Sequence, residues 1–290
     1  MSDLRLLAIH AHPDDESSKG AATMAKYAAE GVDVLVLTCT GGERGDILNP
    51  NMDKPGIKEN MPDIRREEMA KAAAALGVRQ QWLGYVDSGL PEGDPLPSLP
   101  EGCFALVPAQ EVARDLVKAI REFRPQVIIT YDENGGYPHP DHIHVHDTSM
   151  IAWEKAGDPS YAPELGEPWE PLKLYYSHGF VYQRMELLHE DLVRQDKSSP
   201  YEWMMKRWDK NKADIMARVT TQIDCADYFS NREAALQAHA TQIDPAGAFL
   251  ASPVEAQARL WPTEEFELAA TRVPTTIPED DLFAGITPEA

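Results

Sequence analysis

The first half of the chain alternates short apolar segments with longer helical segments, and this order restricts the fold more than any other feature. Largely apolar runs that predict buried strands lie at 4–9, 32–39 and 126–131, and a further strand is expected at 78–85. Segments with helix-forming composition lie at 19–30, 64–76, 109–123 and from about residue 143. Strands that alternate with helices pack as a parallel sheet with helices on both faces. We therefore predict an α/β protein with a Rossmann-like, doubly wound, mostly parallel sheet.

The sequence pattern changes after about residue 157. A further strand is expected at 172–180, mostly helical structure over 181–245, and an extended tail in the last stretch, VPTTIPEDDLFAGITPEA. Leu282 and Phe283 of this tail are expected to dock on the body or on a neighbouring subunit. We predict a core of residues 1–170 and a smaller C-terminal α/β region of residues 171–290 that completes the cleft.

A dinucleotide-binding protein is the obvious alternative for such an order of elements. Its fingerprint, G-x-G-x-x-G, would follow the first strand. The chain has HAHPDDES (10–17) at that place instead. We therefore predict this fold without a nucleotide-binding site. The missing fingerprint weakens the alternative of a nucleotide-binding oxidoreductase.

The charge of the chain restricts its partners. The formal net charge is −21 and the pI is near 4.7, so phosphate backbones and anionic lipid headgroups are repelled. We expect a small-molecule substrate and neither nucleic acid nor a membrane. No apolar run approaches the roughly 20 residues of a membrane helix, and we see no secretory signal. Three widely separated cysteines predict a reducing, cytoplasmic location.

Six of the nine histidines fall in two short segments, and each segment directly follows a predicted strand. The segments are HAHPDDES (10–17), after the first strand, and YPHPDHIHVH (137–146), after the fourth. In open parallel sheets, ligands bind outside the carboxyl ends of the strands. The two segments are therefore expected to meet in one crevice, although they are far apart in sequence.

Imidazoles and carboxylates gathered at one place predict a metal site. Catalytic zinc commonly takes three protein ligands from His, Asp and Glu and leaves a fourth position for water, whose pKa it lowers. Of two adjacent carboxylates, one can bind the metal while the other accepts the proton of the water. Asp14 and Asp15 are such a pair. Asp141 is a candidate to orient a histidine ligand.

The spacing alone leaves the histidine ligands ambiguous. His10 and His12 would share a face if the strand continued that far, so either could ligate. His142 and His146 would share a face of the following helix, so either or both could ligate. His144 is expected to be solvated or to face the core.

Two motifs together carry a specific resemblance. AHPDDE (11–16) and HPDH (139–142) resemble the zinc-dependent de-N-acetylases of the LmbE-like, PIG-L-type superfamily. Further matches are GGERG (41–45), RREEMAKAAAALG (65–77) and DSG (87–89). The resemblance covers about the first 160 residues. It implies a metal hydrolase in the core and one zinc ion per chain, with Fe²⁺ as a metal that the same ligands tolerate.

The resemblance also implies roles for individual residues. The metal ligands would be His12, Asp15 and His142. The catalytic residues would be Asp14 as general base on the attacking water, His139 as general acid or stabiliser of the tetrahedral intermediate, Tyr137 as support for the oxyanion, and Asp141 as the orienting carboxylate. Substrate-binding roles are expected for Lys19, Glu43, Arg65 and Asp87, each of which could also be an ordinary helix, turn or surface residue.

Within the superfamily, three features resemble the mycothiol S-conjugate amidases of actinobacteria. They are ESSKGAATMAKYA (16–28), GGERGDILNP (41–50) and the long C-terminal region with EDDLFAGI (279–286). This implies hydrolysis of the amide between an S-substituted N-acetylcysteine and glucosaminyl-inositol, which yields a mercapturic acid in thiol-based detoxification.

Other interpretations remain open at this point. The alternative within the superfamily is a deacetylase of N-acetylglucosaminyl-inositol in mycothiol biosynthesis. A module that binds metal or carbohydrate without catalysis would keep the ligands but need no base at Asp14. Whether the chain forms a homo-oligomer is also left open, since no clean apolar face predicts an interface.

Overall fold

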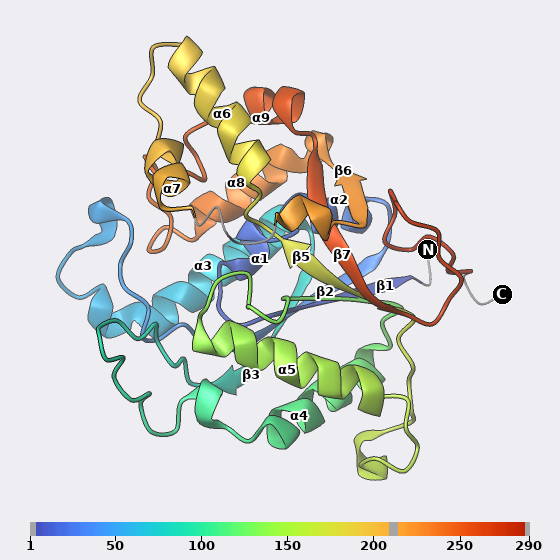
Figure 1. Cartoon of the computed structure of the whole chain (residues 1–290). Coiled ribbons are helices and arrows are strands. Elements are labelled where there is room, and N and C mark those ends of the chain that lie inside the picture. Colours follow the sequence, from blue (N-terminus) through green and yellow to red (C-terminus); the bar gives the residue numbers. More distant parts are fainter. Residues whose placement is uncertain (1–3, 209–213, 288–290) are drawn as a thin grey trace.

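A seven-stranded sheet forms the centre of the computed structural model, which describes residues 4–208 and 214–287 (Figure 1). Its strand order is β3-β2-β1-β4-β5-β7-β6. The first five strands in sequence run parallel, and the last two are antiparallel to their neighbours. The strands are β1 Arg5–His10, β2 Asp33–Thr40, β3 Arg79–Tyr85, β4 Val127–Thr130, β5 Lys173–His178, β6 Thr221–Asp224 and β7 Thr263–Thr271. The prediction of a mostly parallel, Rossmann-like sheet is confirmed.

Helices cover both faces of the sheet (Figure 1). One face packs against α4 (Ala109–Phe123) and α5 (Pro140–Lys155). The other packs against α2 (Ala21–Ala29), α3 (Met61–Leu76) and α8 (Phe229–Ala238). Successive side chains of β1 alternate between these two cores. A strand buried on both faces must be apolar throughout, which is why the sequence shows continuous apolar runs.

Three helices begin at other residues than predicted. Helix α3 begins at Met61 instead of residue 64, with a proline in its first turn. The helix expected at 19–30 begins at Ala21, as α2, after Gly20 at a φ of 85° that glycine adopts readily. A separate short helix, α1 (Asp15–Ser18), precedes it and was not predicted. Helix α5 begins at Pro140, ahead of the predicted residue 143. His139 caps it, because its Nδ1 accepts the backbone N–H of Asp141 at 3.1 Å. This early start places His142 in the first turn.

The C-terminal part adds helices and two strands. Helices α6 (Tyr182–Arg194), α7 (Tyr201–Arg207) and α9 (Val254–Leu260) gather at the top of Figure 1. Strand β6 lies in the segment predicted as mostly helical, and β7 was not predicted. The four residues of β6 are too few for a periodic pattern. The buried glutamates Glu264 and Glu265 interrupt the apolar pattern of β7.

The predicted boundary between residues 170 and 171 falls just before β5. This strand pairs with β4, so the C-terminal part extends the sheet of the core. The division into a core and a smaller region stays a prediction. The tail docks on the body: Leu282 and Phe283 are buried, and the Phe283 ring lies 5.2 Å from that of Tyr27.

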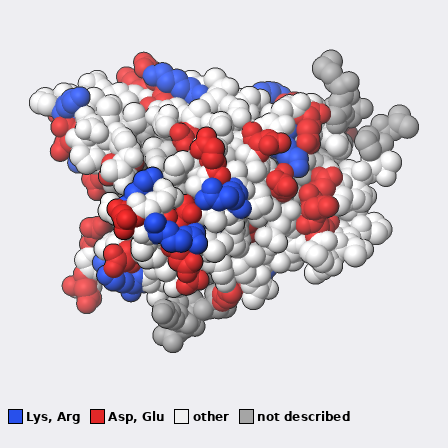
Figure 2. Space-filling view, turned by 90° about the horizontal axis from the view of Figure 1, so that it is seen from above, with Lys and Arg blue, Asp and Glu red and all other residues white. Residues whose placement is uncertain are grey.

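Charged side chains of both signs share the surface seen in Figure 2. Among the described residues of that face, basic side chains lie in small groups beside acidic ones and form no broad basic area. An anionic nucleic-acid backbone would find no extended attractive surface there. Within the described part of the chain, no helix has the length and apolar character needed to cross a membrane.

Candidate metal centre and active site

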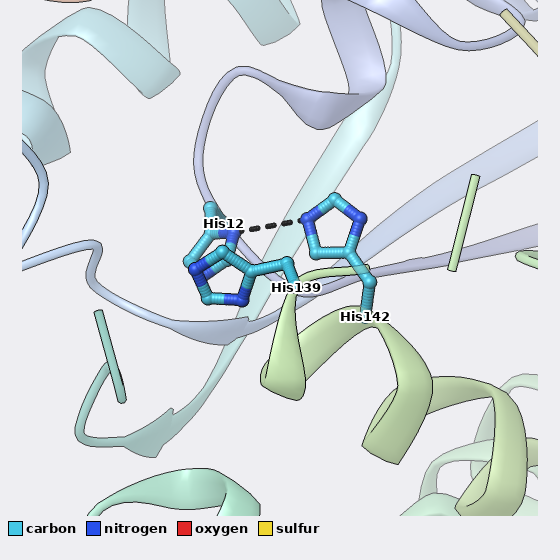
Figure 3. Close-up of side chains that lie close together, drawn as sticks. All are labelled: His12, His139 and His142. Carbon is cyan, nitrogen blue, oxygen red and sulfur yellow. Dashed lines mark hydrogen bonds between the residues drawn. The ribbon is translucent and has the colours of Figure 1, made fainter. Parts of the chain in front are cut away.

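The histidine-rich segments meet where the strand order reverses. Strands β1 and β4 are neighbours in the sheet, while β2 follows β1 on its other side. Ligands bind at such a switch point, at the carboxyl ends of the strands. His12 follows β1, whereas His139 and His142 stand at the start of α5, just beyond β4 (Figure 3). The three rings bring nitrogen atoms within 4.8 Å of one another.

Three donor atoms form a nearly regular triangle at this point. His12 Nδ1 lies 3.2 Å from His142 Nε2 and 3.5 Å from Asp15 Oδ2, and the latter two atoms are 3.3 Å apart. Ligands at about 2.0–2.1 Å from a tetrahedral zinc are about 3.3–3.4 Å from each other. The residues therefore fit a tetrahedral cation with three protein ligands and one free position.

Further contacts orient both imidazoles toward the centre of this triangle. His142 Nδ1 lies 2.9 Å from the carbonyl oxygen of Gly135, so it carries the proton and leaves Nε2 free to ligate. His12 Nε2 lies 3.2 Å from Asp141 Oδ2 and 3.3 Å from Asp87 Oδ1, which leaves Nδ1 free in the same way. Asp141 therefore lies against the ring of His12, and its orienting role stays a prediction.

The carboxylates around His12 favour positive charge at this place. Burial opposes charge on the ring, but hydrogen bonds with Asp141, Asp15 and Asp87 raise the pKa of His12 well above its usual value. A bound cation would meet the same negative surroundings. Asp141 is itself held by the backbone N–H of Ser88, at 2.9 Å, and by the Ser88 hydroxyl.

His139 presents a neutral ring to the site. Burial lowers its pKa to about 4, so the ring is uncharged at pH 7. Since Nδ1 accepts the N–H of Asp141, the network assigns the ring proton to Nε2. His139 thus offers an N–H donor beside the metal ligands. Tyr137 also lines the cavity, with its ring 4.6 Å from that of His142.

Asp14 has the geometry and environment of a general base. Its φ of 129° is a strained conformation for a residue other than glycine, and such strain concentrates at functional sites. Burial raises the pKa of its carboxyl, although Arg65, 3.4 Å away, opposes the rise. A carboxylate with a raised pKa accepts a proton more readily near neutral pH.

These groups open onto a cavity of about 600 Å³. His12, Asp14, Asp87, Tyr137 and His139 line its inner end. The arrangement can therefore hold a metal ion, an attacking water and a substrate carbonyl next to a base and a neutral N–H donor.

Comparison with known proteins agrees with this geometry. The family model PIG-L, described as GlcNAc-PI de-N-acetylase, matches residues 7–153, just over half of the chain. The chain belongs to this family. It is 59% identical to mycothiol S-conjugate amidase of Streptomyces coelicolor over 290 residues, which is 99% of each chain. The matched segment contains all three atoms of the metal triangle.

Two further comparisons show more distant similarity. The chain is 40% identical to 1D-myo-inositol 2-acetamido-2-deoxy-alpha-D-glucopyranoside deacetylase of Streptomyces scabiei, over 97% of this chain and 90% of that one. Its fold is similar to that of the N,N'-diacetylchitobiose deacetylase of Pyrococcus horikoshii, with a TM-score of 0.60 at 19% identity, over 98% of this chain and 86% of that one.

The four expected substrate-binding residues occupy different positions in this PIG-L site. Arg65 and Asp87 line the cavity. Lys19 is buried beside the metal triangle, with its Nζ 2.6 Å from Asp15 Oδ1. Glu43 accepts the backbone N–H of Asp87 at 3.0 Å. Lys19 and Glu43 are not among the residues that line the cavity, and their roles in substrate binding stay predictions.

The histidines that spacing left ambiguous separate clearly in the structure. His10 is fully buried, and its Nδ1 lies 3.2 Å from the hydroxyl of Tyr131. That hydroxyl donates to Asp15 Oδ2, so His10 stands behind the metal triangle. His146 lies 3.0 Å from the carbonyl oxygen of Tyr131, and His144 packs its ring on that of Phe104.

A buried ion pair next to Asp14 was not predicted from the sequence. His239, at the end of α8, lies 2.7 Å from Glu16, and both side chains are fully buried. The other carboxylate oxygen of Glu16 accepts the backbone N–H of Asp14 at 2.9 Å. The pair thereby supports the strained loop. Glu16 is part of the quoted motif, but nothing near His239 in the sequence signals this contact.

Replacing His239 by alanine is expected to lower the free energy of unfolding by about 3–5 kcal/mol, because a buried carboxylate loses its partner. Urea denaturation measures the change. The matched control is Arg79→Gln, which breaks an exposed pair with Asp33 and is expected to change stability little. Equal effects of the two substitutions would contradict a stabilising role for the buried pair.

The same pair predicts how that stability difference depends on pH. Burial opposes charge on Glu16, but His239 outweighs it and lowers the pKa of Glu16 from 4.5 to about 2. The contribution of Glu16 is therefore complete above pH 4.5 and lost as the pH falls toward 2. Despite burial, Glu16 raises the pKa of His239 above 6.5. The stabilisation by His239 is complete below pH 6.5 and is lost as the pH rises through the raised pKa of His239. The stability difference between the wild type and His239→Ala is therefore largest near pH 5–6.

Proposed function

We propose that this protein is an amidase that hydrolyses mycothiol S-conjugates in the cytoplasm. The scissile amide joins an S-substituted N-acetylcysteine to the amine of glucosaminyl-inositol. The products are a mercapturic acid and glucosaminyl-inositol, which makes the reaction a step of thiol-based detoxification. The three cysteines are free and buried, in keeping with a reducing compartment.

We assign the metal to zinc, held by His12, Asp15 and His142. When bound, zinc polarises the substrate carbonyl and lowers the pKa of water. Asp14 takes the proton of the attacking water, helped by its raised pKa. His139 is neutral and donates a hydrogen bond from Nε2 to the developing negative charge. The proton that Asp14 takes from water is then passed to the leaving amine, which balances the hydrolysis. Tyr137, at the cavity wall, supports the oxyanion, while Asp141 holds His12 in its ligating orientation.

The observation that carries this proposal is the 59% identity to the Streptomyces coelicolor amidase along 99% of both chains. Identity to the deacetylase of Streptomyces scabiei is 40%. The difference supports an amidase over a deacetylase. The deacetylation of N-acetylglucosaminyl-inositol remains the second candidate, because the ligands and base serve either amide.

The test compares kcat/KM for a bimane conjugate of mycothiol and for N-acetylglucosaminyl-inositol. We expect strong preference for the conjugate, loss of activity after chelation, and recovery when zinc is added. Preference for the acetylated sugar would assign the chain to the deacetylases. A parallel anaerobic reconstitution with Fe²⁺ decides between the two metals, since imidazole and carboxylate ligands accept both.

A further inference from the structure

The cavity at the metal centre has two chemically different parts. Its inner part carries charged and polar side chains, among them Asp14, Arg65, Asp87 and His139. Its outer part is formed largely by leucines and prolines. These side chains, the apolar rim, are Leu48, Leu90, Pro91, Pro97, Leu99 and Pro100.

Two leucines of the apolar rim are exposed to a degree that is unusual for this chain. Leu48 is 59% exposed and Leu90 is 52% exposed, whereas most large apolar side chains of the described residues are buried. Single exposed apolar residues are common, but apolar side chains gathered at the mouth of a cavity mark a binding surface.

Hydrogen bonds hold the two segments that carry these leucines. The N–H of Leu48 donates to the carbonyl oxygen of Thr241 at 2.9 Å. The side-chain amide of the next residue, Asn49, donates to the carbonyl oxygen of Ala240 at 2.7 Å. Leu90 follows Gly89, whose N–H donates to Asp87 Oδ1 at 2.8 Å. The surface is therefore formed before a ligand binds, which reduces the entropy cost of binding.

The apolar rim begins close to the reacting centre. Asp87 contacts both His12 and the turn that carries Leu90. In an S-conjugate, the sulfur lies three bonds from the scissile carbonyl carbon. A carbonyl at the metal would therefore bring the substituent on sulfur to the outer part of the cavity, while glucosaminyl-inositol hydroxyls suit the polar part.

We propose that the apolar rim receives the sulfur substituent and selects neutral, apolar or aromatic substituents. This inference rests on the proposed amidase function. Two acidic side chains, Asp46 and Glu92, and one arginine, Arg44, also line the cavity. Arg44 donates to the carbonyl oxygen of Asp87. The two acids and the net charge of −21 therefore disfavour anionic substituents.

A second apolar cavity, of about 330 Å³, competes for this assignment. It is lined by Phe180, Met185, Leu188 and Phe249 among others, with Ser17 and Ser18 at one side. It shares no lining residue with the metal cavity. A substituent attached near the scissile bond reaches the apolar rim directly, whereas it would have to pass the α1 segment to enter the second cavity.

The test uses three conjugates that differ only in the group on sulfur: methyl, benzyl and carboxymethyl. We expect wild-type kcat/KM to be highest for benzyl and lowest for carboxymethyl. In the double variant Leu48→Ser/Leu90→Ser, kcat/KM for benzyl should fall by about tenfold or more, because two apolar contacts are lost. The value for methyl should change by less than about twofold.

Two matched variants complete the experiment. Leu96→Ser removes a leucine of the same loop that is 65% exposed but does not line the metal cavity, and it should leave the benzyl preference intact. Benzyl preference that survives in the double variant overturns the inference. So does its loss in Phe249→Ser, which would place the substituent in the second cavity. A wild type that hydrolyses only the acetylated sugar instead refutes the proposed function.

Discussion

Replacing Asp14 by asparagine is expected to lower kcat by about 10²- to 10⁴-fold, the usual contribution of a general base. The amide cannot accept a proton from the attacking water. Asparagine tolerates positive φ at least as well as aspartate, so the strained backbone at 129° is expected to persist. The measurement is kcat and KM for the conjugate, together with metal content by mass spectrometry.

The control for this variant is Asp147→Asn, an exposed carboxylate on α5 outside the cavity. It should behave as wild type. In Asp14→Asn, metal content and KM should stay close to the wild-type values while kcat falls. Full turnover by Asp14→Asn would remove Asp14 from the mechanism and require a different base.

Replacing His142 by alanine is expected to abolish metal binding, with activity lower by on the order of 10³-fold or more, because water is no longer activated. The site loses one of its three ligand atoms, His142 Nε2, and the two that remain, from His12 and Asp15, are too few for a tetrahedral site. A second readout does not depend on activity. Zinc should raise the melting temperature of the wild type, since it binds the folded state, but not that of His142→Ala.

The matched control lies one turn further along α5. His146→Ala removes a histidine of the same helix face, whose Nδ1 contacts the carbonyl oxygen of Tyr131 and not the triangle. It should retain the metal and the zinc-dependent rise in melting temperature. If His146→Ala loses the metal and His142→Ala keeps it, the ligand assignment is wrong.

The fold was predictable because its information is local in the sequence. Strands buried on both faces, such as β1, appear as short apolar runs, and α4 matches its predicted bounds, 109–123. Strands β6 and β7 were missed because their stability comes from pairing and from buried ion pairs. Glu264 lies 3.3 Å from Arg232, and Glu265 lies 3.5 Å from Arg184. A run that contains glutamates does not appear as a strand until these distant partners are known.

Much of the candidate site was predictable for a similar reason. Parallel strands place their carboxyl ends at one edge, so a histidine-rich segment after β1 and another after β4 must lie close together once the sheet forms. The choice between His10 and His12, and between His142 and His146, could not be made from spacing. It depends on which rings reach the triangle: His142 Nε2 lies 3.2 Å from His12 Nδ1, whereas His10 and His146 contact Tyr131 instead.

The sequence by itself predicted the parallel strands of the core and the two motifs of the candidate metal site, because each strand and each motif is formed by residues close together in the chain. Only the tertiary structure decided which atoms form the triangle, that His239 supports Asp14 through Glu16, and that Leu48 and Leu90 share one rim with the catalytic groups. Contacts between residues as far apart as Glu16 and His239 follow from how whole helices pack on the sheet. No local pattern encodes that packing.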